Sequence, residues 1–271
     1  MFKTIFKETL KYIALVSCLF FILFPLYILL AYSLKDTNSV ASGDYSIHIS
    51  RWDFSNYNFF ATSDFWRALG LSFSAILIFN LIRITIYTTF GAAYYLANAK
   101  IKKILLISLF IITSTPEFGL FLALKSILIN LNLIQTASYF NLAVNSIFSF
   151  YLCFQLAKEI ENTNKNKLVL AKLDNLNIWN RIYYIYWTNL KGVYLIIIIF
   201  SSIAVWNDYL WANFVLSGTQ NKTIAIWFRE LGPTPSGGNF QNIQSAGAFI
   251  SILFPLGIYA IFSKKITKFA F

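Results

Sequence analysis

Residues 168–217 read LVLAKLDNLNIWNRIYYIYWTNLKGVYLIIIIFSSIAVWNDYLWANFVLS, and this stretch decides the fold class. Its second half, from Gly192 to Ser217, is almost wholly apolar. It is long enough to cross a bilayer as a helix, because an α-helix rises about 1.5 Å per residue. Its first half, from Leu168 to Lys191, mixes apolar side chains with charged and amide side chains. The stretch therefore predicts a polar loop followed by a membrane-spanning helix.

The polar half of this stretch has the pattern of two short amphipathic helices that meet at a turn. Asp174 and Asn175 interrupt the apolar pattern, and both residue types favour caps and turns over helix interiors. Beyond them, Ile178, Ile182 and Ile185 recur at the spacing of one helical face. Such an apolar face suits insertion into a groove of a partner protein, and it equally suits a helix lying on the membrane surface.

The composition indicates an integral membrane protein. Hydrophobic residues make up 58% of the 271 residues and charged residues 12%, whereas about 25% charged residues is usual in soluble domains. The formal net charge of +11 comes from lysines between apolar segments, which indicates membrane topology and argues against nucleic-acid binding. Cys18 and Cys153 lie in apolar segments, and His48 has no Cys or His close in sequence. The sequence therefore favours neither disulfide bonds nor a metal site.

Apolar segments along the chain predict an all-α integral membrane protein with six transmembrane helices. The segments are Tyr12–Ser33, Leu69–Leu96, Ile104–Ile129, Ala137–Ala157, Gly192–Ser217 and Ile243–Phe262. Most of the 22 lysine and arginine residues fall near the two ends of the chain, at residues 100–103 and in the loop 158–191. The positive-inside rule places these regions, and so both termini, in the cytoplasm. Loops 35–66 and 218–241 are then extracellular, and residues 1–271 form a single transmembrane domain.

Ionisable residues inside apolar segments are costly in lipid and indicate functional positions. There are four such residues: Arg83, Glu117, Lys125 and Asp208. Arg83 and Glu117 both fall near the middle of their segments, and an ion pair between them would offset the desolvation cost of each. Asp208 is expected to cap a helix or to pair with a neighbouring span, at Lys125.

Amide and aromatic side chains in the fourth and fifth segments suggest a path for a polar solute. Asn141, Asn145 and Ser149 recur at i, i+4 and i+8 and form a polar stripe along one helix, which fits a cavity wall and a helix interface equally well. The fifth helix is either locally unwound at Trp206–Trp211, as at substrate sites of transporters, or intact. The intact helix is favoured here, and on it Asn207 and Trp211 would share a face toward the path. Sugars are bound by aromatic faces together with amides and carboxylates, so the expected translocation-path residues are Asn141, Asn145, Trp206, Asn207 and Trp211.

Two motifs resemble those of permease subunits from carbohydrate-type ABC importers, of the maltose-permease kind. These permeases have a cytoplasmic loop with Glu-Ala-Ala, then Asp-Gly-Ala, then Ile. Ala171, Asp174 and Ile185 stand at matching positions here, with Asn175 in place of the Gly. The segment Trp206–Trp211, WNDYLW, is similar to a Trp-Asn-Asp segment of the same class. The resemblance covers nearly the whole chain and implies the type I permease fold of ABC importers.

This resemblance also implies a function and its partners. The loop 158–191 would dock a separate ATPase through Ala171, Asp174, Asn175, Ile178, Ile182 and Ile185. The implied partners are a second related permease subunit, two ATPase subunits, an extracellular solute-binding protein and membrane lipid. ATP and magnesium would bind to the ATPase, because this sequence has no Walker A loop, so the chain is not expected to be an enzyme. The solute would be a sugar or a related polar solute such as glycerol phosphate.

A second class of function is a self-contained secondary transporter or channel. Arg83, Glu117 and Asp208 would then form an ion or proton path. The absence of a visible inverted repeat in the sequence argues against this class. A membrane-embedded enzyme is a third class, but the sequence has no constellation of His, Cys or paired carboxylates for it.

Overall fold

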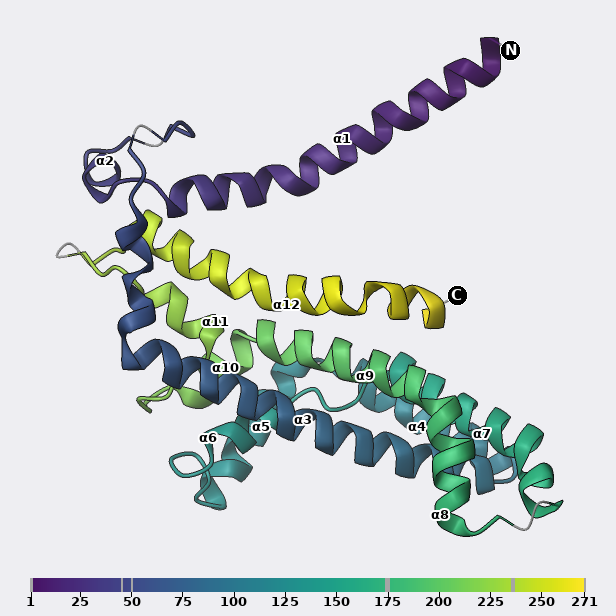
Figure 1. Cartoon of the computed structure of the whole chain (residues 1–271). Helices are drawn as coiled ribbons and strands as arrows, with labels where there is room; N and C mark the ends of the chain where they lie inside the picture. The colour runs from purple at the N-terminus through teal and green to yellow at the C-terminus, as the bar shows by residue number, and fades with distance from the viewer. Residues whose placement is uncertain (1, 45, 50, 174–175, 235–236, 271) are drawn as a thin grey trace. The chain divides into compact units, whose positions relative to one another are not determined.

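The computed structural model describes residues 2–44, 46–49, 51–173, 176–234 and 237–270, and it is helical nearly throughout (Figure 1). Within these residues the chain has isolated β-bridges, at Lys35–Trp52 and Pro233–Asn239, and no strand. The chain forms two compact units, residues 1–66 with 226–256 and residues 67–225 with 257–271. Helices α3 (Ser63–Leu96) and α12 (Gln241–Ala270) run from one unit into the other.

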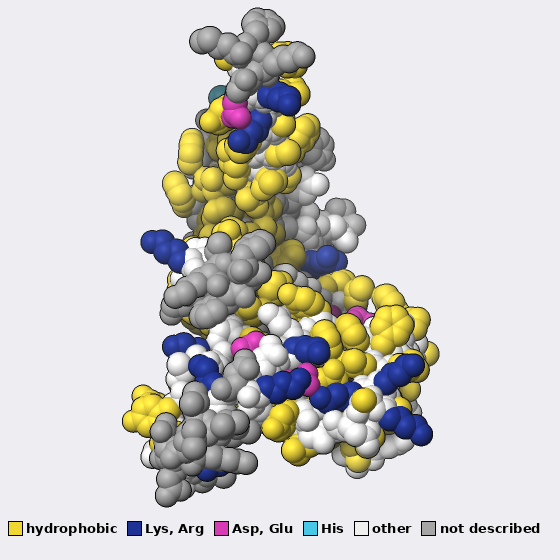
Figure 2. Space-filling model, turned by 90° about the vertical axis from the view of Figure 1, so that its right-hand side faces the viewer, with side chains coloured by type: hydrophobic (Ala, Val, Ile, Leu, Met, Phe, Trp, Pro, Cys, Tyr) yellow, Lys and Arg dark blue, Asp and Glu magenta, His cyan; other side chains and the backbone are white. Residues whose placement is uncertain are grey.

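In the described part of the chain, four helical segments are long and apolar enough to cross a membrane. They are Ile5–Ser33 of α1 (Phe2–Ser33), Ser63–Leu96, Arg181–Asn207 and Gln241–Lys264. Helices α4 (Ala99–Ser114) and α5 (Glu117–Asn130) add a fifth if they are taken together as one bent span. Hydrophobic side chains cover much of the face shown in Figure 2. A surface of this kind belongs in lipid, and the protein is a multi-pass membrane protein.

The third and fourth spans were expected to be continuous helices, but in the structure both are broken. Helices α4 and α5 meet at an angle of 89° because Pro116 follows Thr115, and a residue before proline is pushed into extended backbone. In the fourth segment, α6 (Ser138–Ala143) ends early, and α7 (Phe150–Leu173) begins after an irregular stretch at 144–149. The expected polar stripe along one helix is therefore wrong, because Asn145 lies outside both helices.

The fifth expected span is also broken. Helix α9 (Thr188–Asn207) ends at Asp208, whose backbone is extended, with φ −71° and ψ 96°. Helix α10 (Leu210–Leu216) follows almost at once. The intact helix expected through Trp211 is thus wrong.

The expected pair of short helices in the loop 158–191 is also different in the structure. The first is the end of the long helix α7, and the second runs without a break from α8 (Ile178–Asn180) through the π-helix η2 (Arg181–Trp187) into α9. A π-helix bonds residue i to i+5, so α-helical spacing does not hold across Ile182 and Ile185.

Apolar side chains from α3, α4, α7 and α9 form the core of the unit of residues 67–225. The buried members are Tyr87, Leu109, Leu152, Cys153, Leu156, Ile160, Leu190, Ile196 and Ile197. Helices α3 and α7 approach closely at Gly91, where an added Cβ would lie 2.5 Å from Ile160 Cδ1 and 3.3 Å from the Cα of Ala157. Small residues allow such close approach between membrane helices.

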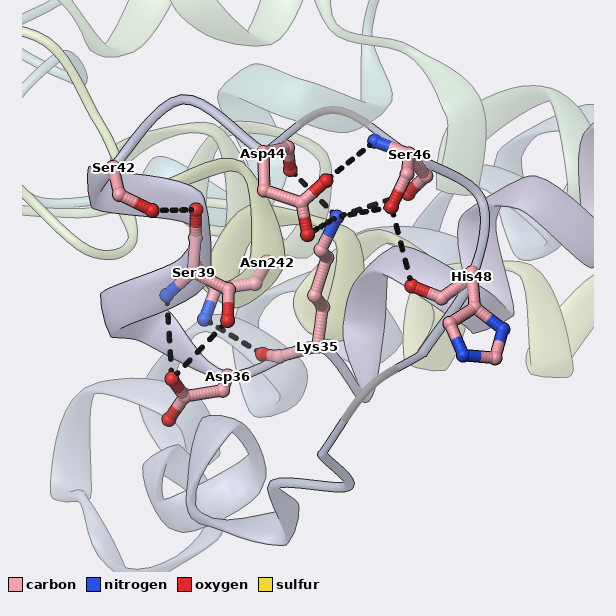
Figure 3. Close-up of polar contacts among 8 residues, drawn as sticks. All are labelled: Lys35, Asp36, Ser39, Ser42, Asp44, Ser46, His48 and Asn242. Carbon is pink, nitrogen blue, oxygen red and sulfur yellow. Dashed lines mark hydrogen bonds and ion pairs between the residues drawn. The ribbon is translucent and has the colours of Figure 1, made fainter.

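The other unit is organised around the buried ammonium group of Lys35, just after α1 (Figure 3). This side chain is 2% exposed, and its Nζ lies 2.9 Å from Asp44 Oδ2 and donates to the carbonyls of Asp44 (2.6 Å) and Ser46 (2.9 Å). Hydrogen bonding from Ser46, assisted by Lys35, lowers the pKa of Asp44 to about 2. At the start of α12, Asn242 Nδ2 donates to the Lys35 carbonyl, at 3.2 Å.

The short helices of this unit are α2 (Thr37–Ala41), η1 (Phe54–Ala61) and η3 (Phe228–Glu230), and α11 (Ile224–Trp227) begins at its boundary. Asn242 Nδ2 also donates to Thr37 Oγ1 and Asn56 Oδ1, both at 2.8 Å. Amides at buried positions are usually bonded in this way, since an unpaired polar group is costly. The two asparagines thus tie the start of α12 to the segment that follows α1.

Candidate functional site

Residues at or beside the three helix breaks line one cavity of about 580 Å³ in the unit of residues 67–225. Its polar lining includes Arg83, Glu117, Asn145, Asn207 and Asp208, and aromatic lining comes from Phe79, Phe148 and Phe150. Helices α4, α6 and α9 end there, and α5, α7 and α10 begin there. Irregular backbone at membrane depth is tolerated where it lines a cavity, and interrupted helices of this kind surround solute sites in transporters.

Arg83 holds the irregular backbone between α6 and α7. Its Nε and Nη2 donate to the carbonyls of Ile147 (2.8 Å) and Ser146 (3.1 Å), and Nη1 donates to Ser201 Oγ (2.8 Å). Ser146 has a positive φ of 50°, a strained conformation for a residue with a side chain. Tyr87 also holds this irregular backbone, because its hydroxyl donates to the Ile147 carbonyl at 2.9 Å.

The expected ion pair between Arg83 and Glu117 is not formed, although both residues line the cavity. The guanidinium group instead bonds carbonyls that the helix break leaves free, and it stacks 4.7 Å from the ring centroid of Phe79. A helix break supplies several backbone acceptors close together, and a guanidinium group has five donors to satisfy them. The charge of Arg83 is therefore balanced by dipoles and not by a carboxylate.

Asp208 caps the helix that follows it. Its Oδ1 accepts a hydrogen bond from the backbone N of Trp211, at 3.1 Å, in the first turn of α10. Capping by Asp208 is thus confirmed, whereas the expected pairing with Lys125 is wrong. Lys125 Nζ donates to the carbonyl of Phe214 (2.7 Å) and to Ser217 Oγ (2.8 Å), where its charge suits the C-terminus of α10.

The five expected path residues divide into two groups. Asn145 and Asn207 line the cavity. Asn141, Trp206 and Trp211 instead lie in the interior, where they are 0%, 4% and 0% exposed. Trp211 Nε1 donates to the carbonyl of Asn141 at 2.9 Å, so these two residues join α10 to α6. Asn207 and Trp211 do not share a face, because the helix breaks between them.

The expected docking residues are only partly described. Asp174 and Asn175 lie outside the described residues, and Ala171 and Ile178 are described as members of α7 and α8. Ile182 is 46% exposed and lines a second cavity of about 450 Å³ with Asn164, Tyr186 and Tyr194. Ile185 is 7% exposed and packs inside the chain, so the expectation of one free apolar face does not hold for it. The π-helix accounts for the difference.

Several lining residues were not predicted from the sequence: Phe79, Thr113, Phe148 and Phe150. A signal for part of this group was present, because Phe79, Arg83 and Tyr87 recur at the i, i+4 spacing of one helical face. Phe148 and Phe150 carried no comparable signal, since residues 137–157 were expected to form one continuous apolar helix. Among the described residues, no three His, Cys, Asp or Glu side chains lie close enough together to hold a metal ion.

Known proteins similar to this chain are permeases of ABC importers. No family model matches the sequence. The chain is 29% identical over 221 residues to the melibiose/raffinose/stachyose import permease protein MelC of Bacillus subtilis, covering 79% of this chain and 76% of that protein. It is 25% identical over 256 residues to the arabinooligosaccharides transport system permease protein AraQ of Bacillus subtilis, covering 90% and 86%.

A solved structure has the same fold. It is a bacterial ABC transporter involved in the import of the acidic polysaccharide alginate, and a chain of it matches this one with a TM-score of 0.77. The match covers 96% of both chains at 14% identity. The resemblance inferred from the two motifs is thereby confirmed.

Proposed function

Because the chain is related to the permease proteins of carbohydrate ABC importers, we propose that it forms half of the translocation path of an ATP-driven importer. The solute is a sugar or a similar polar molecule. A second, related permease chain forms the other half. Two ATPase subunits bind ATP and magnesium, and an extracellular solute-binding protein delivers the solute.

The cavity at the three helix breaks is the observation that carries this proposal. Its lining combines amides and carboxylates with three phenylalanine rings. Amide and carboxylate groups bond the hydroxyl groups of a sugar, and aromatic rings pack on its C–H faces, so this mixture suits a polyhydroxy solute. A cavity built from helix ends can also change shape when the ends move, which alternating access requires.

The chain crosses the membrane six times, with both termini in the cytoplasm. The five candidate spans account for five crossings. The sixth is made by α6 and the apolar start of α7, a broken span like α4 and α5. Its irregular middle is acceptable in a membrane because Arg83 and Tyr87 bond the carbonyl of Ile147, and Arg83 also bonds that of Ser146.

The helical hairpin formed by α7, α8 and η2 docks the ATPase. Several large apolar side chains remain exposed there: Trp179, Ile182, Tyr183, Tyr184 and Trp187. Exposed aromatic and aliphatic side chains of this kind are typical anchors of protein interfaces. Movement of the ATPase then pulls on η2 and, through the continuous helix, on α9 and the cavity at its far end.

Coexpression with an ATPase encoded in the same genome tests the docking. The ATPase should copurify with the chain, and Ile182→Asp should release it or uncouple ATP hydrolysis from uptake while the chain still folds. Ile185→Asp is the matched control, because it buries a charge and should lower the amount of folded chain. Uptake that follows an ion gradient without any ATPase would contradict the proposal and favour a secondary transporter.

A further inference from the structure

We propose that Glu117 and Asp208 make the cavity at the helix breaks a charge filter, which admits neutral and cationic solutes and excludes anions. The inference rests on the proposed function, since it concerns the solutes that pass this cavity. It narrows the solute class to neutral polyhydroxy compounds and cationic amino sugars. It excludes glycerol phosphate and acidic sugars.

The positively charged group in the lining, the guanidinium of Arg83, is bound by other groups of the protein. All three hydrogen bonds of Arg83 go to protein atoms, two of them backbone carbonyls. The residue is 5% exposed and lies between the rings of Phe79 and Tyr87, at 4.7 Å and 5.5 Å from their centroids. A guanidinium group held in this way is not free to form a two-point contact with a phosphate or carboxylate.

The lining holds two carboxylates, those of Glu117 and Asp208. Glu117 is exposed in the first turn of α5, where the helix dipole stabilises a carboxylate. Asp208 accepts hydrogen bonds from the backbone N of Trp211 and from the side chain of Asn145, and it also lines the cavity. In the described part of the chain, the ion pairs involve neither carboxylate. The lining therefore contains two carboxylates and one guanidinium group, whose hydrogen bonds all go to the protein. Negative charge is in excess.

The excess of negative charge in the lining favours neutral and cationic solutes over anionic ones. Hydroxyl groups of a neutral sugar are donors, and free carboxylate oxygens are strong acceptors for them. An anionic solute in the same cavity meets two like charges at short range, and the repulsion is strong where little water separates the groups. Clefts lined by one sign of charge raise the local concentration of the opposite sign by the same effect.

The experiment reads the charge of the cavity from the reaction rates of one thiol. Ala204 is exposed and lines the cavity, so Ala204→Cys in a Cys18→Ala, Cys153→Ala background places a reporter there. The purified full chain in nanodiscs is treated with two methanethiosulfonate reagents of similar size. One carries a trimethylammonium group and the other a sulfonate. The ratio of their rates is divided by the ratio measured with free mercaptoethanol.

The corrected ratio should favour the cationic reagent on the order of tenfold at low salt. Glu117→Gln together with Asp208→Asn should remove this preference, and each single substitution should remove part of it. Asn retains the capping acceptor at position 208, so the helix start is kept while the charge is lost. A corrected ratio near one, or a ratio unchanged by the double substitution, would overturn the proposal. So would a thiol at position 204 that neither reagent reaches.

A second reporter is the control. Gln220→Cys lies in an exposed loop outside the cavity lining, and its ratio should not respond to the double substitution. The experiment needs neither the ATPase nor a known solute. Failure of the charge filter therefore leaves the importer proposal intact, and failure of ATPase copurification leaves the measured cavity charge intact.

Discussion

At the scale of single residues, Arg83 holds the irregular backbone between α6 and α7 in place. The carbonyls of Ser146 and Ile147 lose their helical partners where α6 ends, and Arg83 bonds both. Arg83 itself lies in α3, so it joins this helix to the irregular stretch before α7. An unpaired carbonyl buried at membrane depth would be costly, which explains why a charge is tolerated there.

Arg83→Leu should lower the melting temperature of the purified chain and the amount of folded protein. The reason is the loss of hydrogen bonds to a charged group, each worth about 1.5–3 kcal/mol. Differential scanning fluorimetry in detergent measures the change. Glu117→Leu alone should have little effect on stability, and adding it to Arg83→Leu should give no recovery. Recovery in the double variant would show that the two side chains do pair.

Glu161 has the opposite arrangement, a carboxylate among lysines. It is 7% exposed and lies 2.6 Å from Lys102 Nζ, 3.0 Å from Lys165 Nζ and 3.5 Å from Lys158 Nζ. Hydrogen bonds from Lys102 and Lys165 lower its pKa from 4.5 to about 2. Because the carboxylate is ionised more readily in the folded chain, it stabilises the fold fully above pH 4.5, and this contribution is lost as the pH falls toward 2.

Glu161→Gln should therefore lower the melting temperature at pH 7, and the difference from the unsubstituted chain should shrink steadily below about pH 4.5. Thermal melts of both proteins across this pH range measure the effect. Glu8→Gln is a suitable control, because Glu8 forms an exposed pair with Lys11 and should contribute little. A difference that stays constant down to pH 2.5 would contradict the assignment.

At the scale of elements, the cavity and the helix packing are determined by helix breaks and by close contacts between helices, more than by the length of each helix. The three breaks supply the polar lining of the cavity, whereas the contact of α3 with α7 at Gly91 fixes two long helices against each other. The close approach depends on a small residue, and one of the three breaks depends on a helix-breaking residue. These residues are Gly91 and Pro116.

Gly91→Ala should destabilise the chain by about 1–3 kcal/mol, the usual cost of overpacking. The added methyl group would lie 2.5 Å from Ile160 Cδ1, so α3 and α7 must move apart or Ile160 must change rotamer. Thermal melts measure the loss, and Ile160→Val should restore part of it by removing that atom. Gly70→Ala, in the same helix with nothing within 4 Å, is the control. It should be neutral or stabilising, because Ala favours helix more than Gly.

At the scale of the whole molecule, the proposed topology predicts which positions are reachable from each side. In a Cys18→Ala, Cys153→Ala background, Gln220→Cys should react in intact cells with a membrane-impermeant maleimide. Lys100→Cys should react after the membrane is opened, because the basic segment 100–103 is expected in the cytoplasm. Labelling of position 100 from outside would reverse the orientation. Labelling of both positions from one side would give an even number of crossings between them, whereas the proposed topology has three.

The sequence by itself determined the class of protein, most of its spans and its relationship to carbohydrate ABC permeases. These properties are local: hydropathy over about 20 residues identifies a span, and the WNDYLW and Ala171–Asp174 motifs are read along the chain. Asp208 was also identified as a helix cap, because capping involves residues a few positions apart.

The tertiary structure alone decided which polar groups meet. Arg83 bonds Ser146 and Ile147, more than sixty residues away, where the sequence favoured Glu117. Trp211 faces Asn141 in the interior, whereas Asn207 lines the cavity. Ile185 turned inward because a π-helix replaced the expected α-helix. Each outcome depends on carbonyls, donors and packing partners from distant segments, and a pattern along one helix contains no information about them.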